Sequence, residues 1–202
     1  MSYDSGLTRQ SVLNCAKQEF LEHGYQAANM RSIAKKANVT TGAMYNHFAN
    51  KAVLFDALVQ APAEDMLAQF KKIHKQAMQA AELNAVDSLG QKSLDGTDWM
   101  LDFIYEHMDA FRLIFCRSEG TRWSSYLEEL IEVEETTQRV CFDMLSANGK
   151  HVDDFFLHVS AAVGFQYFVE IVSHDLPYER AASVMDNVKR TSMAGWKELL
   201  GV

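Results

Sequence analysis

Residues 29–48 read NMRSIAKKANVTTGAMYNHF, and they decide the fold of the first part of the chain. Asn29 is a favoured N-cap for a short helix with an apolar stripe behind it. Asn38 interrupts that helix, and asparagine tolerates the left-handed conformation that a tight turn needs. Thr40 and Thr41 offer a second N-cap, and the residues that follow make about two turns of helix. Two short helices joined by such a turn form a helix-turn-helix, which we place at about residues 29–48.

The second of these helices has the surface that entry into a DNA major groove requires, since that groove is only about 12 Å wide. Met44 and Phe48 are spaced to face the core, and Tyr45 ends in a hydroxyl able to reach a phosphate. The exposed face is small and polar, and consists of Thr40, Thr41, Gly42, Ala43, Asn46 and His47. By pattern alone, two short helices packed in an ordinary bundle remain an alternative.

Charge is distributed unevenly along the chain. The 202 residues carry a net charge of −8, which by itself argues against a nucleic-acid partner. Residues 1–51, however, hold six basic and three acidic side chains, so this part is +3 and the remainder is −11. A basic segment on an acidic body is compatible with a polyanionic partner and also with an ordinary solvated surface.

Helical periodicity dominates on both sides of the motif, and no stretch alternates with a period of two. The apolar pattern predicts a first helix over 8–23, with Gly24 as its C-cap. Asn50 can cap a fourth helix that starts at Lys51. Pro62 lies within that helix and cannot donate to the preceding turn, which predicts a kink or an end there.

The acidic remainder of the chain also predicts helices. Residues 84–97 contain two glycines and mixed polarity, and we expect them to be the least structured part. Further helical segments are predicted at about 98–107, 111–116, 123–146, 152–174 and 177–200.

The stretch 12–58 resembles the DNA-binding domain of the TetR family of bacterial regulators. The resemblance covers about a quarter of the chain, and the combination of its motifs is highly specific. The matching pieces are Val12, Cys15, Ala16 and Phe20, then EHGY at 22–25, MRSIAKKANV at 30–39, TGAMYNHF at 41–48, and Lys51 with Leu54 and Phe55.

Four positions depart from the family pattern. Thr41 stands where lysine is frequent, and Asn38 stands where the turn usually has glycine. Glu19 occupies a position that is commonly apolar, and Asn29 replaces the usual serine or threonine cap. None of these substitutions removes the motif.

The resemblance implies which residues contact DNA. It places Asn29, Tyr45, His47 and Lys51 at phosphates, which position a protein without reading sequence. Of the residues directed at bases, Asn46 is the one whose amide can bind a base edge twice, and adenine is its matching base. The base-facing set is Thr40, Thr41, Gly42, Ala43 and Asn46.

The resemblance also implies an all-α chain of about nine helices, with a three-helix DNA-binding domain at 1–55 and a regulatory domain at 56–202. The latter dimerises through its last two helices in this family. Small and apolar residues there suit close helix packing in a four-helix interface, although packing within one chain explains many of them as well. The candidate interface residues are Ala161, Gly164, Val184 and Val188.

A small-molecule pocket is the second implied property of the regulatory domain. Large aromatic side chains gather in the segments 99–126 and 155–168, where they either line a cavity or form the core. His107, His158 and Gln166 are candidate polar anchors for a ligand. The candidate pocket residues are Phe103, His107, Phe111, Phe115, Trp123, Tyr126, Phe165 and Phe168.

Several other classes are not expected from the sequence. The first residues are polar, which predicts no signal peptide, and uninterrupted apolar runs are far shorter than the roughly 20 residues of a membrane helix. Three scattered cysteines favour a reduced, cytoplasmic chain, and the seven histidines lack metal-ligand spacing. No glycine-rich phosphate loop, nucleophile motif or catalytic carboxylate pair predicts an enzyme, and no cofactor is expected.

The sequence therefore predicts a homodimeric, cytoplasmic regulator that binds an operator in double-stranded DNA and is released by a small ligand, with no metal and no membrane. The alternative is an activator or architectural DNA-binding protein of the same fold without a small-molecule ligand.

Overall fold

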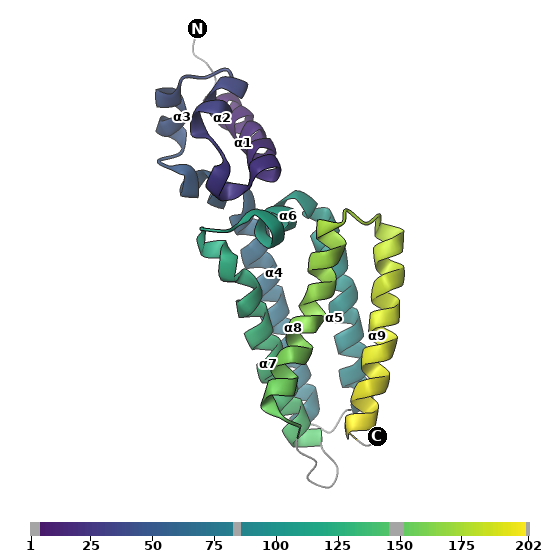
Figure 1. Ribbon diagram of the computed structural model, residues 1–202. Helices are drawn as coiled ribbons and strands as arrows, with labels where there is room; N and C mark the ends of the chain where they lie inside the picture. Colours follow the sequence, from purple (N-terminus) through teal and green to yellow (C-terminus); the bar gives the residue numbers. More distant parts are fainter. Residues whose placement is uncertain (1–4, 83–85, 146–151, 201–202) are drawn as a thin grey trace. The chain divides into compact units, whose positions relative to one another are not determined.

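The computed structural model describes residues 5–82, 86–145 and 152–200, and within these ranges the chain is all-α, as predicted (Figure 1). The described residues contain nine α-helices and one 3-10 helix, and no strand. The elements are α1 (Ser5–Ala27), α2 (Met30–Lys36), α3 (Thr41–His47), α4 (Lys51–Glu82), α5 (Val86–Glu106), α6 (Met108–Arg117), η1 (Arg122–Ser125), α7 (Tyr126–Leu145), α8 (Asp154–Ser173) and α9 (Tyr178–Leu200).

The helices form two compact units. Unit 1 comprises residues 1–64 and 107–126, and unit 2 comprises residues 65–106 and 127–202. Helices α1 to α3 and the first part of α4 therefore pack in one unit with α6 and η1. The division at residue 55 into a DNA-binding and a regulatory domain remains a prediction about function, because packing groups α6 and η1 with the N-terminal helices.

The core of unit 1 is built around aromatic side chains of α1 and α4. Phe20 and Phe55 are fully buried, and their rings meet edge to face at 5.1 Å between centroids. Tyr25 packs against both rings, at 6.0 Å from Phe20 and 5.4 Å from Phe55. Gly24, the predicted C-cap, has φ 73°, a conformation that suits glycine, and the chain turns there before the last residues of α1.

The expectation of little structure over 84–97 is wrong for the described part, since α5 begins at Val86. Glycine disfavours a helix by itself, but it also lets two helices approach closely. A Cβ atom at Gly96 would lie 3.3 Å from Cγ2 of Ile73, so the bare backbone makes room for the side chain of α4. Residues 84 and 85 lie outside the described residues.

Pro62 does not end α4. The helix continues through it from Lys51 to Glu82, which excludes the predicted stop, whereas the kink stays a prediction. The boundary between the two units falls between residues 64 and 65, just after the proline. One continuous helix therefore contributes to both units.

Unit 2 is held by apolar packing and by a few long-range polar contacts. The hydroxyl of Tyr105 on α5 donates a 2.5 Å hydrogen bond to the carbonyl of Leu176, just before α9. Lys189 on α9 forms a 2.6 Å ion pair with Asp98 on α5. Helices α5 and α9, which lie side by side in Figure 1, are thus linked at two levels.

Helix α8 is more apolar than the counting of uninterrupted runs suggested. Among the described residues it is the one helix that is long and apolar enough, by length and composition, to cross a membrane, with a mean hydropathy of 1.5. Only 33% of its most apolar window is buried within the chain. Because core helices of soluble proteins also meet this condition, the finding that α8 adds is an exposed apolar face.

Candidate nucleic-acid interface

The helix-turn-helix is fixed by local hydrogen bonds at the predicted positions. The side chain of Asn29 caps α2 by accepting from the N–H of Arg31 at 2.9 Å. Thr40 caps α3 by accepting from the N–H of Ala43 at 3.1 Å. Asn38 between them has φ 55°, the left-handed conformation predicted for the turn. These three residues set the angle between α2 and α3, which are in contact.

Helix α3 separates a buried face from a polar exposed one. Met44 and Phe48 are buried, at 0% and 1% exposure, as predicted. A Cβ atom at Gly42 would meet no other atom within 4 Å, so this glycine leaves free space at the surface rather than serving a packing contact. The candidate base- and phosphate-contacting residues Thr40, Gly42, Tyr45 and Asn46 are exposed, and Thr41, Ala43 and His47 are half-buried.

Glu19, the buried acid in unit 1, holds α2 onto α1. Its carboxylate accepts from the backbone N–H of Asn29 at 3.1 Å, from the hydroxyl of Ser32 at 2.9 Å and from Lys36 Nζ at 2.9 Å. Burial alone would raise the pKa of Glu19, but these hydrogen bonds and the charge of Lys36 hold it below its ordinary value. The departure from an apolar residue is therefore compensated by three donors around one carboxylate.

Lys51, a predicted phosphate contact, already has partners within unit 1. Its ammonium donates to the carbonyls of Gln26 at 3.0 Å and Ala28 at 3.1 Å, and lies 4.8 Å from the centre of the Tyr25 ring. These contacts satisfy carbonyl groups at the end of α1. An ammonium has three donors, so one remains for a phosphate, and the position of the side chain is set in advance.

Other cations in unit 1 differ in whether an acid neutralises them. Lys17 pairs with Asp109 at 2.7 Å, and Lys36 pairs with Glu19. Arg9, which sequence reasoning missed, has no carboxylate within 4 Å in the described part of the chain; its guanidinium lies 5.2 Å from the centre of the Phe48 ring. Phe48 is the C-cap of α3, so Arg9 places a positive charge at the end of that helix. Because the contact involves residues far apart in sequence, no local pattern indicated it.

The predicted pocket residues are divided between the two units. Phe103, Phe165 and Phe168 belong to unit 2, where Phe165 and Phe168 are both 6% exposed. His107 occupies the N-cap position of α6 without a side-chain capping bond. The residues in unit 1 are His107, Phe111, Phe115, Trp123 and Tyr126. The structure does not gather all eight in one compact unit, and their role in a pocket stays a prediction.

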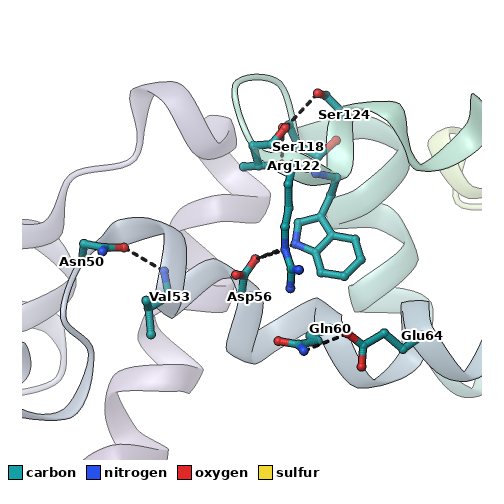
Figure 2. Close-up of polar contacts among 10 residues, drawn as sticks. Asn50, Val53, Asp56, Gln60, Glu64, Ser118, Arg122 and Ser124 are labelled. Carbon is teal, nitrogen blue, oxygen red and sulfur yellow. Dashed lines mark hydrogen bonds and ion pairs between the residues drawn. The ribbon is translucent and has the colours of Figure 1, made fainter.

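Two of these aromatic residues have clear packing partners instead. The hydroxyl of Tyr126 donates to the carbonyl of Ala63 at 2.8 Å, and the indole N–H of Trp123 donates to Asp56 Oδ1 at 2.7 Å. Figure 2 shows Asp56 on α4 directed at Arg122, which precedes that tryptophan in η1. Both polar tips are thus used to fasten η1 and the start of α7 onto α4.

The predicted dimer residues fall into two groups. Ala161 is 1% exposed and is already buried within its own chain, whereas Val184 is 37% exposed. Gly164 faces open space, because a Cβ atom there would meet nothing within 4 Å, and Val188 is half-buried. The large exposed apolar residues of α8, which the prediction did not include, are Phe155, Phe156, Val159, Val163 and Tyr167.

Comparison with known proteins agrees with the motif and with the fold. The family model described as bacterial regulatory proteins, tetR family, matches residues 12–58. UidR, an HTH-type transcriptional regulator of Escherichia coli K12, is 33% identical over 72 residues, which are 36% of this chain and 37% of that protein. FasR, an HTH-type transcriptional activator of Mycolicibacterium smegmatis, is 28% identical over 138 residues, or 68% of this chain and 58% of FasR. The chain thus spans less than two thirds of either curated relative.

The whole fold has counterparts among solved structures. NalD, the secondary repressor of the MexAB-OprM multidrug efflux pump in Pseudomonas aeruginosa, matches with a TM-score of 0.56 at 19% identity, covering 93% of this chain and 97% of NalD. PfmR from Thermus thermophilus also has a TM-score of 0.56, at 16% identity, covering 89% of this chain and 94% of PfmR. With the match over residues 12–58 and the capped helix-turn-helix, these likenesses place the chain in the TetR family of bacterial regulatory proteins.

Proposed function

We propose that the chain is a homodimeric, sequence-specific DNA-binding regulator of transcription in the cytoplasm, and that it is a repressor released by a small, largely apolar ligand. The observation that carries the proposal is α3, whose two ends are set by Thr40 and Phe48 and whose exposed face is small and polar. Such a face fits the major groove, with Asn46 reading a base and Tyr45 at a phosphate.

The exposed face of α8 supports the homodimer. Phe155 is 73% exposed and Val163 49%, and such a row of apolar side chains is typical of an interaction surface. Phe155, Val159 and Val163 lie one turn apart, and an open hollow runs between them and His158. A second copy with the same face would cover this row about a two-fold axis, and would present two α3 helices to two half-sites.

Release by a ligand would be a shift between two populations of the dimer. Helix α4 passes from unit 1 into unit 2 without a break, so a ligand that favours one arrangement of unit 2 acts on a helix that also carries Leu54 and Phe55 of the DNA-binding core. The name of FasR keeps an activator as the second candidate, and a reporter gene behind the selected operator distinguishes the two.

In-vitro selection from random double-stranded DNA by the purified protein tests DNA recognition. We expect enrichment of an inverted repeat, and Asn46→Ala should change the preferred base at one position of each half-site, by about 1–3 kcal/mol. Tyr45→Phe removes only a hydroxyl and should weaken all sequences alike. Failure to enrich any sequence would refute sequence-specific binding.

The dimer has its own test. Val163→Glu places a charge on the exposed row of α8 and should give monomers in analytical ultracentrifugation, with loss of tight operator binding. Glu132→Lys would change the surface charge of α7 at a half-buried position, so the better matched control is Lys71→Glu at an exposed position of α4, which should remain dimeric. A dimer that survives Val163→Glu would place the interface elsewhere.

A further inference from the structure

Unit 2 contains a polar cluster that DNA binding does not use. Its members are His74 on α4 and Glu134 and Gln138 on α7. The ring atom Nε2 of His74 lies 3.2 Å from Glu134 Oε2, and Gln138 Nε2 donates to Glu134 Oε1 at 2.7 Å. One carboxylate therefore holds both neighbours, one on each oxygen.

Each of these neighbours has a second polar atom that is buried and unpaired. His74 Nδ1 and Gln138 Oε1 expose almost no surface, and neither has a hydrogen-bond partner within the described ranges. Buried polar atoms are nearly always paired, because an unpaired one loses its hydration without compensation. Two such atoms on either side of one carboxylate indicate a partner that is not part of the described chain.

Both unpaired atoms are acceptors. The Glu134 carboxylate keeps the ring proton of His74 on Nε2, which leaves the lone pair of Nδ1 free. Burial lowers the pKa of His74, although the charge of Glu134 acts in the opposite direction, so the ring is neutral at pH 7. The Gln138 amide cannot turn round, since its oxygen would then face a carboxylate oxygen.

The surroundings of the cluster are aromatic on one side and open on another. The ring of Phe70 lies 4.1 Å from that of His74, and Phe165 meets Phe70 at 5.6 Å, edge to face. Phe70 and Phe165 are each 6% exposed, whereas the side chain of Glu134 is 28% exposed. A molecule could therefore reach the carboxylate from solvent and place an apolar part near the aromatic rings.

We propose that His74, Glu134 and Gln138 form the effector site of the protein, and that the effector is an apolar molecule ending in a hydrogen-bond donor, a protonated amine. An ammonium group supplies N–H donors to the two unpaired acceptors and a positive charge to the carboxylate. A carboxylate or phosphate end would meet two acceptors and a like charge, and is rejected. This inference rests on the proposed ligand-controlled function and gives the effector its chemical class.

Three probes with one tail and different ends test the chemistry: 4-phenylbutylamine, 4-phenylbutanol and 4-phenylbutyrate. Binding to the full chain is measured by isothermal titration calorimetry without DNA. The amine should bind at least ten-fold more tightly than the carboxylate, with the alcohol between them. Equal binding of amine and carboxylate, or binding of none of the three, would overturn the proposal.

Variants test the place. Gln138→Leu and His74→Phe each remove one unpaired acceptor, so they should fold with an unchanged or raised melting temperature and bind the amine at least ten-fold less tightly. Glu134→Gln should abolish the preference for amine over alcohol. Gln166→Leu alters an exposed amide that bonds only to Glu170 among the described residues, and should bind like the wild type. Amine binding that persists in Gln138→Leu would contradict the assignment.

The two proposals fail separately. Selected DNA that binds, in a protein that binds no probe, overturns the effector site and leaves the DNA-binding function intact. Amine binding lost in Gln138→Leu, in a protein that selects no DNA, supports the site and overturns the DNA-binding function.

Discussion

Trp123 Nε1 donates a 2.7 Å hydrogen bond to Asp56 Oδ1, and this contact joins η1 to α4 inside unit 1. Arg122 Nε lies 3.3 Å from the same oxygen, and its guanidinium stacks 4.4 Å from the centre of the Trp123 ring (Figure 2). The tryptophan is only 7% exposed, so its N–H needs an internal partner. Asp56 thus fastens the helix that follows the helix-turn-helix to the segment that precedes α7.

Replacing Asp56 should destabilise unit 1. Asp56→Ala leaves the buried indole N–H unpaired, and we expect a loss of about 1–3 kcal/mol in the free energy of unfolding, measured with urea. Arg122→Ala removes an exposed partner of the same carboxylate and should cost less than about 1 kcal/mol. Equal losses in the two variants would show that the indole bond does not dominate.

Glu19 gives a prediction for stability and pH. Its three donors should make Glu19→Gln less stable than the wild type by about 1–3 kcal/mol near pH 7. The pKa of Glu19 in the folded chain lies below its ordinary value of 4.5, so the charged form is favoured by folding. This contribution is complete above that ordinary value and is lost as pH falls through the lower, folded value.

Urea unfolding at several pH values checks the Glu19 prediction. The difference between wild type and Glu19→Gln should be constant above about pH 5 and should shrink in more acidic buffer. Glu22→Gln is the matched control, because that carboxylate is exposed and lies 4.0 Å from Lys36. A difference that did not change with pH would mean that the loss came from altered packing and not from charge.

Predictions that depended on neighbouring residues were confirmed. Asn29, Asn38 and Thr40 act within a few residues of their own position, so caps and turn chemistry identify them directly. The alternation of α3 between buried Met44 and exposed Asn46 follows from helical spacing in the same way.

Features that depend on distant partners could not be predicted. The compensation of Glu19 requires Lys36 to arrive from α2, and the unpaired acceptors near Glu134 require His74 to arrive from α4. Gly96 suggested a break in the helix because the side chain that needs its space, Ile73, lies in another helix. In each case one sequence position carries a meaning that only the packed structure reveals.

Free and neutralised cations should differ in their effect on DNA binding. Arg9→Ala should weaken binding to all sequences alike and reduce the slope of log K against log salt by about 0.9, the loss of one phosphate contact. Lys17→Ala removes a cation already paired with Asp109, and should leave that slope unchanged. Competition binding at several salt concentrations measures both, and the same slope change in the two variants would contradict the distinction.

Cys141 tests the environment of Glu134 independently of any ligand. Burial and the nearby charge of Glu134 raise the pKa of Cys141 from 9.0 to about 11. Since only the thiolate reacts, alkylation by iodoacetamide at about pH 8 should be about 100-fold slower than for a thiol with the ordinary value. Glu134→Gln removes the charge but not the burial, so it should lower the pKa only in part and speed the reaction. The same pKa shift disfavours the folded chain above about pH 9, where the unfolded thiol ionises first. Mass spectrometry of the labelled peptides over a range of pH follows Cys141 separately from Cys15 and Cys116, and fast labelling of Cys141 in mildly alkaline buffer would contradict its place beside Glu134.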